Sequence, residues 1–242
     1  MTTYTLQREE LLALLNRAGV STAHGISDAF LPPLAAGETV TGADFSSEEL
    51  ALAQLLAHPH RVVHAIRFDV NDSVQEEAWF YMADDHFASL TAVSSGYELS
   101  TIDNLETLIF NAGTILPIRP TPDTVASRVV LDREDFVDVR YLLTNWHEVS
   151  GEMVLEAAGM EKFEAVNLAH SVQSQEWHGR LSFKFYQNDQ LTAERELRGM
   201  QSSDTCWLGY LEPETGKMIV QSANSQVMDN VAFRIWEALD ES

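Results

Sequence analysis

The stretches "LQREELLALL" (residues 6–15) and "LDREDFVDVRYLL" (residues 131–143) place Leu, Arg and an acidic pair in the same order, 125 positions apart. Apolar residues recur at helical spacing in both, which predicts amphipathic helices around residues 6–18 and 131–146. Helices that begin in this way are common, so two matches can also arise by chance. The match nevertheless favours one structural unit that is used twice along the chain.

The segments that follow each of these stretches support the same interpretation. Each half continues with sequence rich in β-branched and aromatic residues, which predicts strands. Each half then ends in a predicted helix, and the two helices share an Asp-Asn pair, Asp103-Asn104 and Asp229-Asn230. The predicted strands are 61–70 and 77–84 in the first half and 177–189, 190–200 and 205–212 in the second, and the closing helices are 100–116 and 222–239.

Prolines separate the two halves. Pro117, Pro120 and Pro122 each remove a backbone donor and favour extended geometry before them, so neither a helix nor a central strand is expected to cross this segment. We expect a first structural repeat at 1–116, a proline-rich connector at 117–128 and a second repeat at 129–242. The predicted fold class is α/β (α+β), an internally duplicated helix-strands-helix unit with quasi-twofold symmetry and a central, mostly antiparallel sheet, packed as one globular body.

Charge restricts the partners. The 242 residues include 37 Asp and Glu against 15 Lys and Arg, a formal net charge of -22, and no basic run exists. Nucleic acid and anionic membrane surfaces are therefore not expected to bind. No apolar stretch approaches the length of a membrane span, and the N-terminus lacks the pattern of a signal peptide, so we expect a cytoplasmic protein. A strongly acidic surface favours solubility and fast encounter with basic partners.

Residues that could carry chemistry are few. His58, His60 and His64 lack a third or fourth partner in a metal motif, and a predicted strand start separates them. The single cysteine, Cys206, excludes an intramolecular disulfide and a Cys-based zinc site, and it is expected in the core. We therefore predict no catalytic residue, metal, cofactor or small-molecule substrate. The acidic pairs are interpreted as solvated turns, and most of the tryptophans as core residues; these are Glu76-Glu77, Asp84-Asp85, Asp132 with Asp135, Trp79, Trp146, Trp177, Trp207 and Trp236.

One loop is a candidate for binding a partner. Residues 71–76 are predicted to form a polar turn between two strands, with Val74 as its apolar tip. Such a turn is either an ordinary hairpin connection or a partner-binding finger on a rigid sheet. The candidate partner-binding residues are Asn71, Asp72, Ser73, Val74, Gln75 and Glu76.

The C-terminal region resembles the EspG-like chaperones of type VII (ESX) secretion. "DTCWLGY" (204–210) is similar to that family's Asp-Thr strand followed by Gly and an aromatic residue, and "MIVQSANSQVMDNVAFRIWEAL" (218–239) is similar to its last strand and final helix. "FSSEELALAQLLAHPHRVVHAIR" (45–67) and the opening 6–20 resemble its early helices and first strand. Two positions depart: "LGY" stands in place of Gly-Arg-Tyr, and "QSAN" replaces a proline after the last strand.

The resemblance implies a duplicated, quasi-twofold α/β protein without a catalytic site. It implies that the protein holds helical Pro-Pro-Glu type secretion substrates in the cytoplasm and covers an apolar helical tip. The first hypothesis is therefore a binding protein with a protein client, expected to be helical. The alternatives are an acidic immunity-type protein that neutralises a basic toxin, and an enzyme that uses acidic pairs.

Overall fold

The computed structural model describes residues 2–20, 23–27, 30–32, 44–119, 128–132, 148–203 and 205–238. The helices within these ranges are α1 (Arg8–Arg17), α2 (Ser47–Ala57), α3 (Leu105–Thr114), α5 (Glu148–Ala157), α6 (Lys162–Gln173) and α7 (Ser225–Ala238). The strands are β1 (Thr3–Leu6), β2 (Arg61–Asp69), β3 (Val74–Ala83), β4 (His86–Val93), β5 (Gly96–Ile102), β6 (Arg128–Leu131), β7 (Trp177–Gln187), β8 (Gln190–Gln201), β9 (Cys206–Leu211) and β10 (Met218–Ser222).

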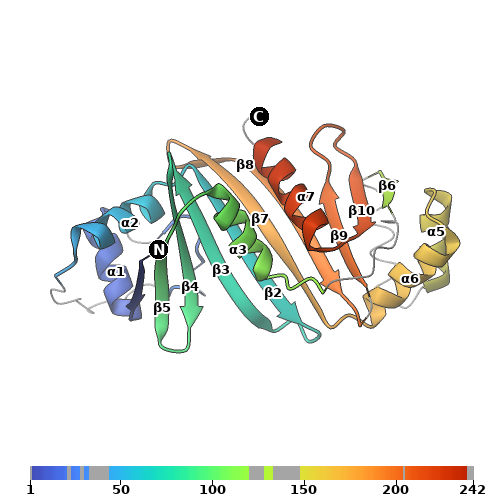
Figure 1. Cartoon of the computed structure of the whole chain (residues 1–242), viewed down its shortest axis with the longest axis horizontal. Helices are drawn as coiled ribbons and strands as arrows, with labels where there is room; N and C mark the ends of the chain where they lie inside the picture. The colour runs from blue at the N-terminus through green and yellow to red at the C-terminus, as the bar shows by residue number, and fades with distance from the viewer. Residues whose placement is uncertain are drawn as a thin grey trace. The chain divides into compact units, whose positions relative to one another are not determined.

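The strands form a ten-stranded sheet in the order β1-β5-β4-β3-β2-β7-β8-β9-β10-β6 (Figure 1). Neighbouring strands such as β4 and β5 or β9 and β10 pair antiparallel. The predicted α+β fold with an antiparallel sheet is confirmed. The strand order is symmetric: if β1 to β5 are matched with β6 to β10 in turn, the order is the same from both edges of the sheet. This symmetry supports the duplicated unit, which stays a proposal.

The matching stretches 6–15 and 131–143 each begin with the last residue of an edge strand. Leu6 ends β1, paired with β5, and Leu131 ends β6, paired with β10. Both leucines are buried. Their matching positions therefore reflect burial in the core and not the period of a helix. The prediction that a helix begins at Leu131 is therefore wrong, and residues 133–146 of that predicted helix lie outside the described residues.

The helices α3 and α7 begin with the same capping arrangement. The Asn104 side chain accepts a hydrogen bond from the backbone N–H of Thr107 (2.8 Å), and Asn224 accepts one from Val227 (2.9 Å). Each satisfies an N–H group that the first helical turn leaves without a partner. The second Asp-Asn pair, Asp229-Asn230, instead lies inside α7, so Asn224 is the counterpart of Asn104.

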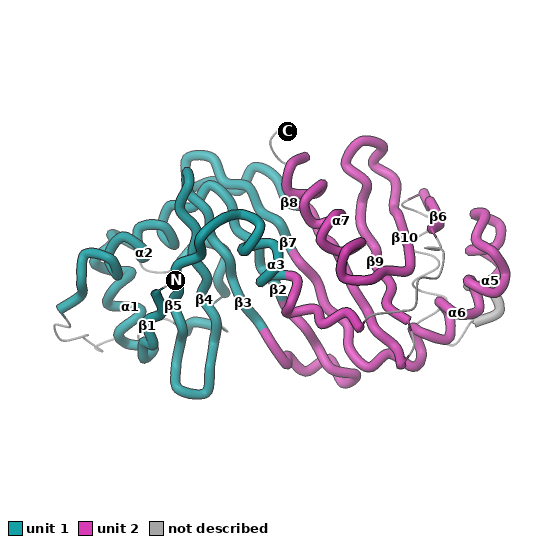
Figure 2. Tube along the Cα trace, in the orientation of Figure 1, with its two compact units in different colours: residues 1–65, 77–112, 182–194 teal, residues 66–76, 113–181, 195–242 magenta. Residues whose placement is uncertain are grey.

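Two compact units divide the chain, and the division runs through β2, β3, β7 and β8 (Figure 2). Unit 1 comprises residues 1–65, 77–112 and 182–194. Its core lies between α1, α2 and one face of the strands β2 to β5. Leucines of both helices pack there against buried aromatic residues; the core includes Leu11, Leu15, Leu52, Leu56, Trp79, Tyr81, Leu90 and Leu99.

Unit 2 comprises residues 66–76, 113–181 and 195–242. One of its cores joins the helices α5 and α6 to β6, β9 and β10. The buried residues are Val129, Leu131, Leu155, Met160, Ala165, Leu168, Ala169, Trp207 and Val220. Since α5 and α6 were not predicted from the sequence, this core is a finding of the structure.

The proline-rich connector is described only at its two ends. Pro117, Ile118 and Arg119 form neither helix nor strand, as expected, but Arg128 already belongs to β6, and residues 120–127 lie outside the described residues. The boundaries 1–116 and 129–242 stay a prediction. Within the described ranges, no helix is long and apolar enough to cross a membrane.

A glycine allows β7 to lie close to β2. A Cβ atom at Gly179 would overlap the carbonyl oxygen of Ile66 and lie 2.5 Å from Leu116 Cδ2. At Gly199 of β8, the nearest atoms to such a Cβ are 3.5 Å away, which is ordinary contact. The pairing of β2 with β7 therefore requires glycine at position 179 and tolerates a larger residue at position 199.

We expect Gly179→Ala to lower the free energy of unfolding by about 1–3 kcal/mol, because the added methyl group must displace a neighbouring strand or Leu116. The matched control, Gly199→Ala, is expected to change it by less than about 1 kcal/mol. Urea unfolding followed by tryptophan fluorescence measures both. Equal stability of the two variants would contradict this role of Gly179.

Candidate functional site

The hairpin between β2 and β3 carries the predicted partner-binding residues. Asp69 Oδ1 accepts hydrogen bonds from the backbone N–H groups of Asn71 (2.8 Å) and Ser73 (3.0 Å), and the Asp69 N–H donates to the Ser73 carbonyl (3.0 Å). A carboxylate that binds its own backbone two residues on is a device that fixes turns. The turn at the end of this hairpin is therefore closed by Asp69.

The predicted extent of this turn is wrong. The structure ends the turn at Ser73, and Val74, Gln75 and Glu76 belong to β3. The bonds between Asp69 and Ser73 close the hairpin there, which leaves the next residues free to pair as a strand. The start of β3 was missed in the sequence because Gln75 and Glu76 are polar. The outer end of a hairpin does not need apolar residues.

Asp72 holds the tip of the hairpin against β7. Its backbone adopts φ 60°, a left-handed conformation that Asp tolerates better than most residues. Its carboxylate Oδ1 lies 2.8 Å from His178 Nε2, and the His178 ring stacks on Phe68 of β2 with 5.1 Å between ring centroids. A residue 106 positions away in sequence thus contacts the tip.

The acidic residues of the hairpin are bound within the hairpin or to β7. Asp69 binds backbone N–H groups, Asp72 pairs with His178, and Glu76 pairs with Arg67 at 2.9 Å. The apolar side chains are not covered: Val70 is 56% exposed and Val74 52% exposed. The tip therefore presents two valines on a fixed turn whose charges have internal partners.

A second group of exposed apolar side chains lies on α5 and α6, in the same compact unit (Figure 2). These are Met153, Phe163 and Val166. In α6 the buried apolar residues are Ala165, Leu168 and Ala169, at helical spacing, so Phe163 and Val166 lie off the buried face. In the sequence, Phe163 and Val166 are apolar residues outside the apolar stripe of α6, which is the signal for their exposure. The helix α6 itself was not predicted.

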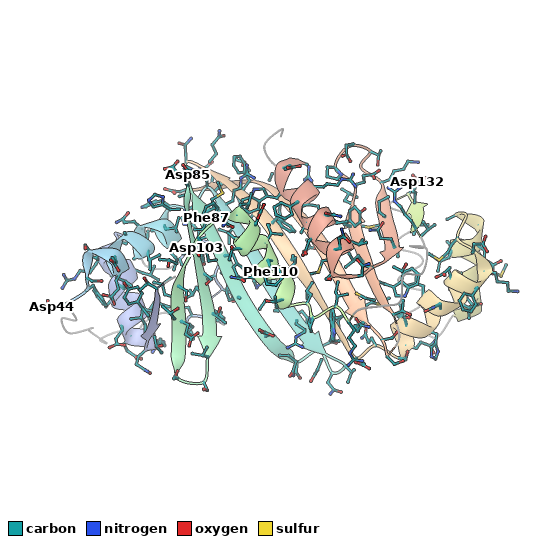
Figure 3. All side chains as sticks on the ribbon, viewed as in Figure 1. Asp44, Asp85, Phe87, Asp103, Phe110 and Asp132 are labelled. Atoms are coloured by element: carbon teal, nitrogen blue, oxygen red, sulfur yellow. The ribbon has the colours of Figure 1, made fainter. Side chains whose placement is uncertain are left out.

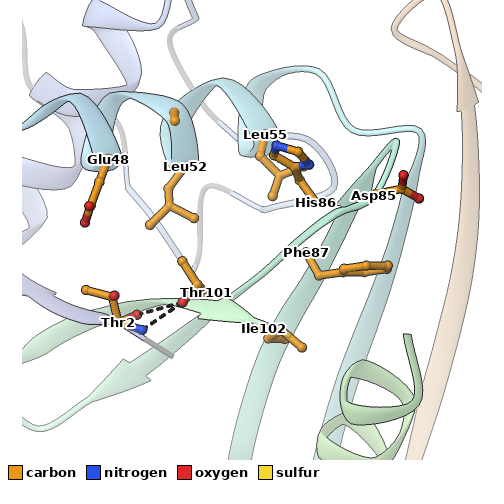
Figure 4. A pocket seen from close by; sticks show the side chains of 10 residues that line it. Thr2, Glu48, Leu52, Leu55, Asp85, His86, Phe87, Thr101 and Ile102 are labelled. Carbon is orange, nitrogen blue, oxygen red and sulfur yellow. Dashed lines mark hydrogen bonds between the residues drawn. The ribbon is translucent and has the colours of Figure 1, made fainter. Parts of the chain in front are cut away.

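A groove of about 470 Å³ lies in unit 1, beside α2 and the ends of β4 and β5 (Figure 4). Leu52, Leu55, Phe87 and Ile102 line it together with the carboxylates of Glu48 and Asp85. Glu48 accepts a hydrogen bond from the Tyr4 hydroxyl (2.8 Å). Figure 3 shows Phe87 on β4 and the exposed Phe110 on α3. Among the described residues that line this groove, no set of groups indicates a reaction.

The three histidines of "HPHRVVH" bind three different acids. His58 pairs with Asp189 (3.1 Å), His60 lies 3.7 Å from Asp84, and His64 pairs with Glu77 (2.7 Å) while it stacks on Trp79. Among the described residues, no three His, Cys, Asp or Glu side chains are grouped as a metal site requires.

The acidic pairs also separate. Glu76 and Glu77 are consecutive in a strand, and their partners differ, Arg67 for the first and His64 for the second. Asp132 lies 3.7 Å from Lys217, and Asp135 lies outside the described residues. Carboxylates arranged in this way serve as ion-pair partners rather than as a pair that faces one substrate.

Cys206 and four tryptophans lie in the core, as predicted. Trp79, Trp177, Trp207 and Trp236 are buried, and Trp146 lies outside the described residues. Burial raises the pKa of the Cys206 thiol to about 12. The cause is the loss of water around the buried thiol, which disfavours the charged thiolate.

Comparison with solved structures finds the same arrangement of elements. The chain is similar to the Mycobacterium tuberculosis type VII secretion system chaperone EspG5, solved in complex with the PE25-PPE41 dimer. The TM-score is 0.72 at 13% sequence identity, over 98% of this chain and 96% of EspG5. The chain has an EspG-like fold. No family model matches the sequence, and no curated protein does either.

The segments that carried the sequence resemblance occupy defined places in this EspG-like fold. Residues 206–211 of "DTCWLGYLE" form β9, and "MIVQS" forms β10 directly before α7. "SEELALAQLLA" forms α2, and the Ser46 side chain caps it by accepting a hydrogen bond from the Glu49 N–H. Gln221 of "QSAN" pairs with Arg128 of β6, so the position without proline contributes a residue to the sheet.

We expect Cys206 to be inert toward thiol reagents in the folded protein. The thiolate is the reactive form, and a pKa of about 12 keeps the buried thiol protonated at pH values up to about 9. Titration with a chromogenic disulfide reagent should give no reaction in native buffer and one equivalent in guanidinium chloride. Rapid reaction of the native protein would contradict the burial of this side chain.

Proposed function

We propose that this protein is a non-enzymatic, cytoplasmic binding protein that holds a helical secretion substrate in solution, as a type VII secretion chaperone does. The observation that carries the proposal is the β2–β3 hairpin, where Val70 and Val74 are exposed while every neighbouring acid has a partner in the protein. The EspG-like fold supports it, because EspG5 is a chaperone that was solved with a protein dimer.

The hairpin suits an apolar client tip. Val70 and Val74 are each about half exposed, so a partner that buries the remaining area contributes about 1 kcal/mol for each valine. The turn is already fixed by the hydrogen bonds of Asp69, so little conformational entropy is lost when a client binds. Phe163 and Val166 of α6 in the same unit add exposed apolar area for a longer helical client.

The paired charges of the hairpin argue against the immunity-type alternative at this surface. Neutralisation of a basic toxin by electrostatic steering needs carboxylates that are available to the toxin. Asp69, Asp72 and Glu76 instead have partners in backbone N–H groups, His178 and Arg67, and these pairings reduce the net negative charge that the tip presents. Apolar contact at the tip is expected to persist in salt that screens ion pairs.

The test is affinity capture of a client from the host lysate by the tagged protein, washed at low and at high salt. The double variant Val70→Ser/Val74→Ser should retain at least about tenfold less client than the original protein, because each lost apolar contact costs about 1 kcal/mol or more. Quantitative mass spectrometry of the retained proteins measures the ratio.

Leu191→Ser is the matched control, since Leu191 is 49% exposed at the start of β8, near the β7–β8 turn. This variant should retain as much client as the original protein, and all variants should show the same unfolding midpoint. A client lost equally from both variants, or one released by high salt from the original protein, would refute apolar binding at the β2–β3 hairpin.

A further inference from the structure

We propose that the groove beside α2 and the ends of β4 and β5 binds an extended basic segment of a protein partner, in which an apolar side chain lies between two lysine or arginine side chains. The groove belongs to unit 1, whereas the tip of the β2–β3 hairpin belongs to unit 2, and the two share no residue. This partner site therefore goes beyond the proposed client site, and each can be tested without the other.

The floor of the groove is apolar. From α2 it receives Leu52 and Leu55, which follow Glu48 at helical spacing and therefore lie on the same side of the helix as this carboxylate. Phe87 of β4 and Ile102 of β5 complete the floor. Leu52 and Leu55 also belong to the buried core of unit 1, so folding fixes the floor before a partner binds.

Two exposed acids form the rim of the groove. Glu48 lies toward one end of the apolar floor and Asp85 toward the other (Figure 4). The Tyr4 hydroxyl donates a hydrogen bond to Glu48 Oε2 (2.8 Å), which fixes the direction of this side chain. The same hydrogen bond raises the pKa of Tyr4, so the phenol stays protonated and does not cancel the charge of Glu48. Glu48 also lies in the first turn of α2, where the helix favours a negative charge.

A tight turn positions the second acid. Ala83 of β3 pairs with His86 of β4, which leaves Asp84 and Asp85 as the residues of the turn between these strands. The carboxylate of Asp84 lies 3.7 Å from His60. Asp85 is therefore the acid of this turn that lines the groove.

The charge of the groove selects a basic partner. The backbone N–H of Thr2 donates to Thr101 Oγ1 (2.8 Å), and the Thr101 N–H donates to the Thr2 carbonyl (2.9 Å), so these two lining residues bind each other. Among the described residues that line the groove, none is lysine or arginine, and His86 is the one imidazole. An apolar floor between two carboxylates complements a ligand that is apolar in the middle and basic at both ends.

The length of the floor suits an extended peptide. From position 48 to position 55, α2 rises by about 10 Å. An extended chain rises about 3.3 Å per residue and places every second side chain on the same face, so a basic, an apolar and a second basic side chain on one face span about 13 Å. The exposed rim lets such a chain continue past both ends, whereas sites for small molecules enclose most of the ligand.

Photo-cross-linking of the full chain with a defined peptide tests this site. The probe is Lys-Ser-photoleucine-Ser-Lys, capped at both ends, and mass spectrometry maps the residues to which it is joined. The cross-links should fall within residues 45–57 and 85–102. Their yield should drop by about threefold or more in the double variant Glu48→Gln/Asp85→Asn, because each exposed ion pair contributes up to about fivefold in affinity. Glutamine at position 48 keeps an oxygen that can accept the Tyr4 hydrogen bond.

The double variant Glu152→Gln/Glu156→Gln on α5 is the matched control, because it removes the same charge from the other unit and should leave the yield unchanged. An equal unfolding midpoint shows that each variant is folded. Cross-links scattered over the chain, or lost equally from both double variants, would mean general attraction to an acidic surface and overturn the proposal. Full displacement of the peptide by an equimolar amount of hexylammonium would overturn it as well, since the groove would then be a site for a small amine.

Discussion

The pairing of β2 with β7 is the constraint on which the rest of the structure depends. It is the point in the strand order where the first five strands meet the second five. The Tyr186 N–H donates to the His60 carbonyl (2.8 Å), and Gly179 leaves room for the Ile66 backbone. Because β2 also forms one side of the β2–β3 hairpin, this pairing brings His178 to its tip. The same ladder thus joins the sheet and shapes the candidate site.

The properties of the β2–β3 hairpin tip depend on how the carboxylates of this acidic chain are paired. A net charge of -22 would surround any apolar patch with carboxylates. At the β2–β3 hairpin each carboxylate instead satisfies a backbone N–H, an imidazole or a guanidinium group. Among the described residues of this hairpin, the acids beside the two exposed valines therefore have partners. Solubility is supplied by the rest of the surface, while the tip is free to contact an apolar client.

Much of the fold was predictable because its signals are local. The aromatic residues of 177–189 identified β7, and the leucines of α1 identified a buried helix face. The edge strands β1 and β6 were missed because four residues give too short a pattern. The Asp72–His178 contact was not predictable, because it joins residues 106 positions apart whose meeting is fixed only by the β2–β7 pairing. The hairpin was located correctly, but its turn was drawn too long.

Site-specific photo-cross-linking in the native host tests the central claim most directly. A benzoylphenylalanine placed at position 74 reports what touches the hairpin tip, and one at position 191 reports an equally exposed site elsewhere. We predict that irradiation joins a single helical protein to position 74 and nothing abundant to position 191. The same partner cross-linked from position 191 but never from position 74 would contradict the claim that clients bind at the β2–β3 hairpin.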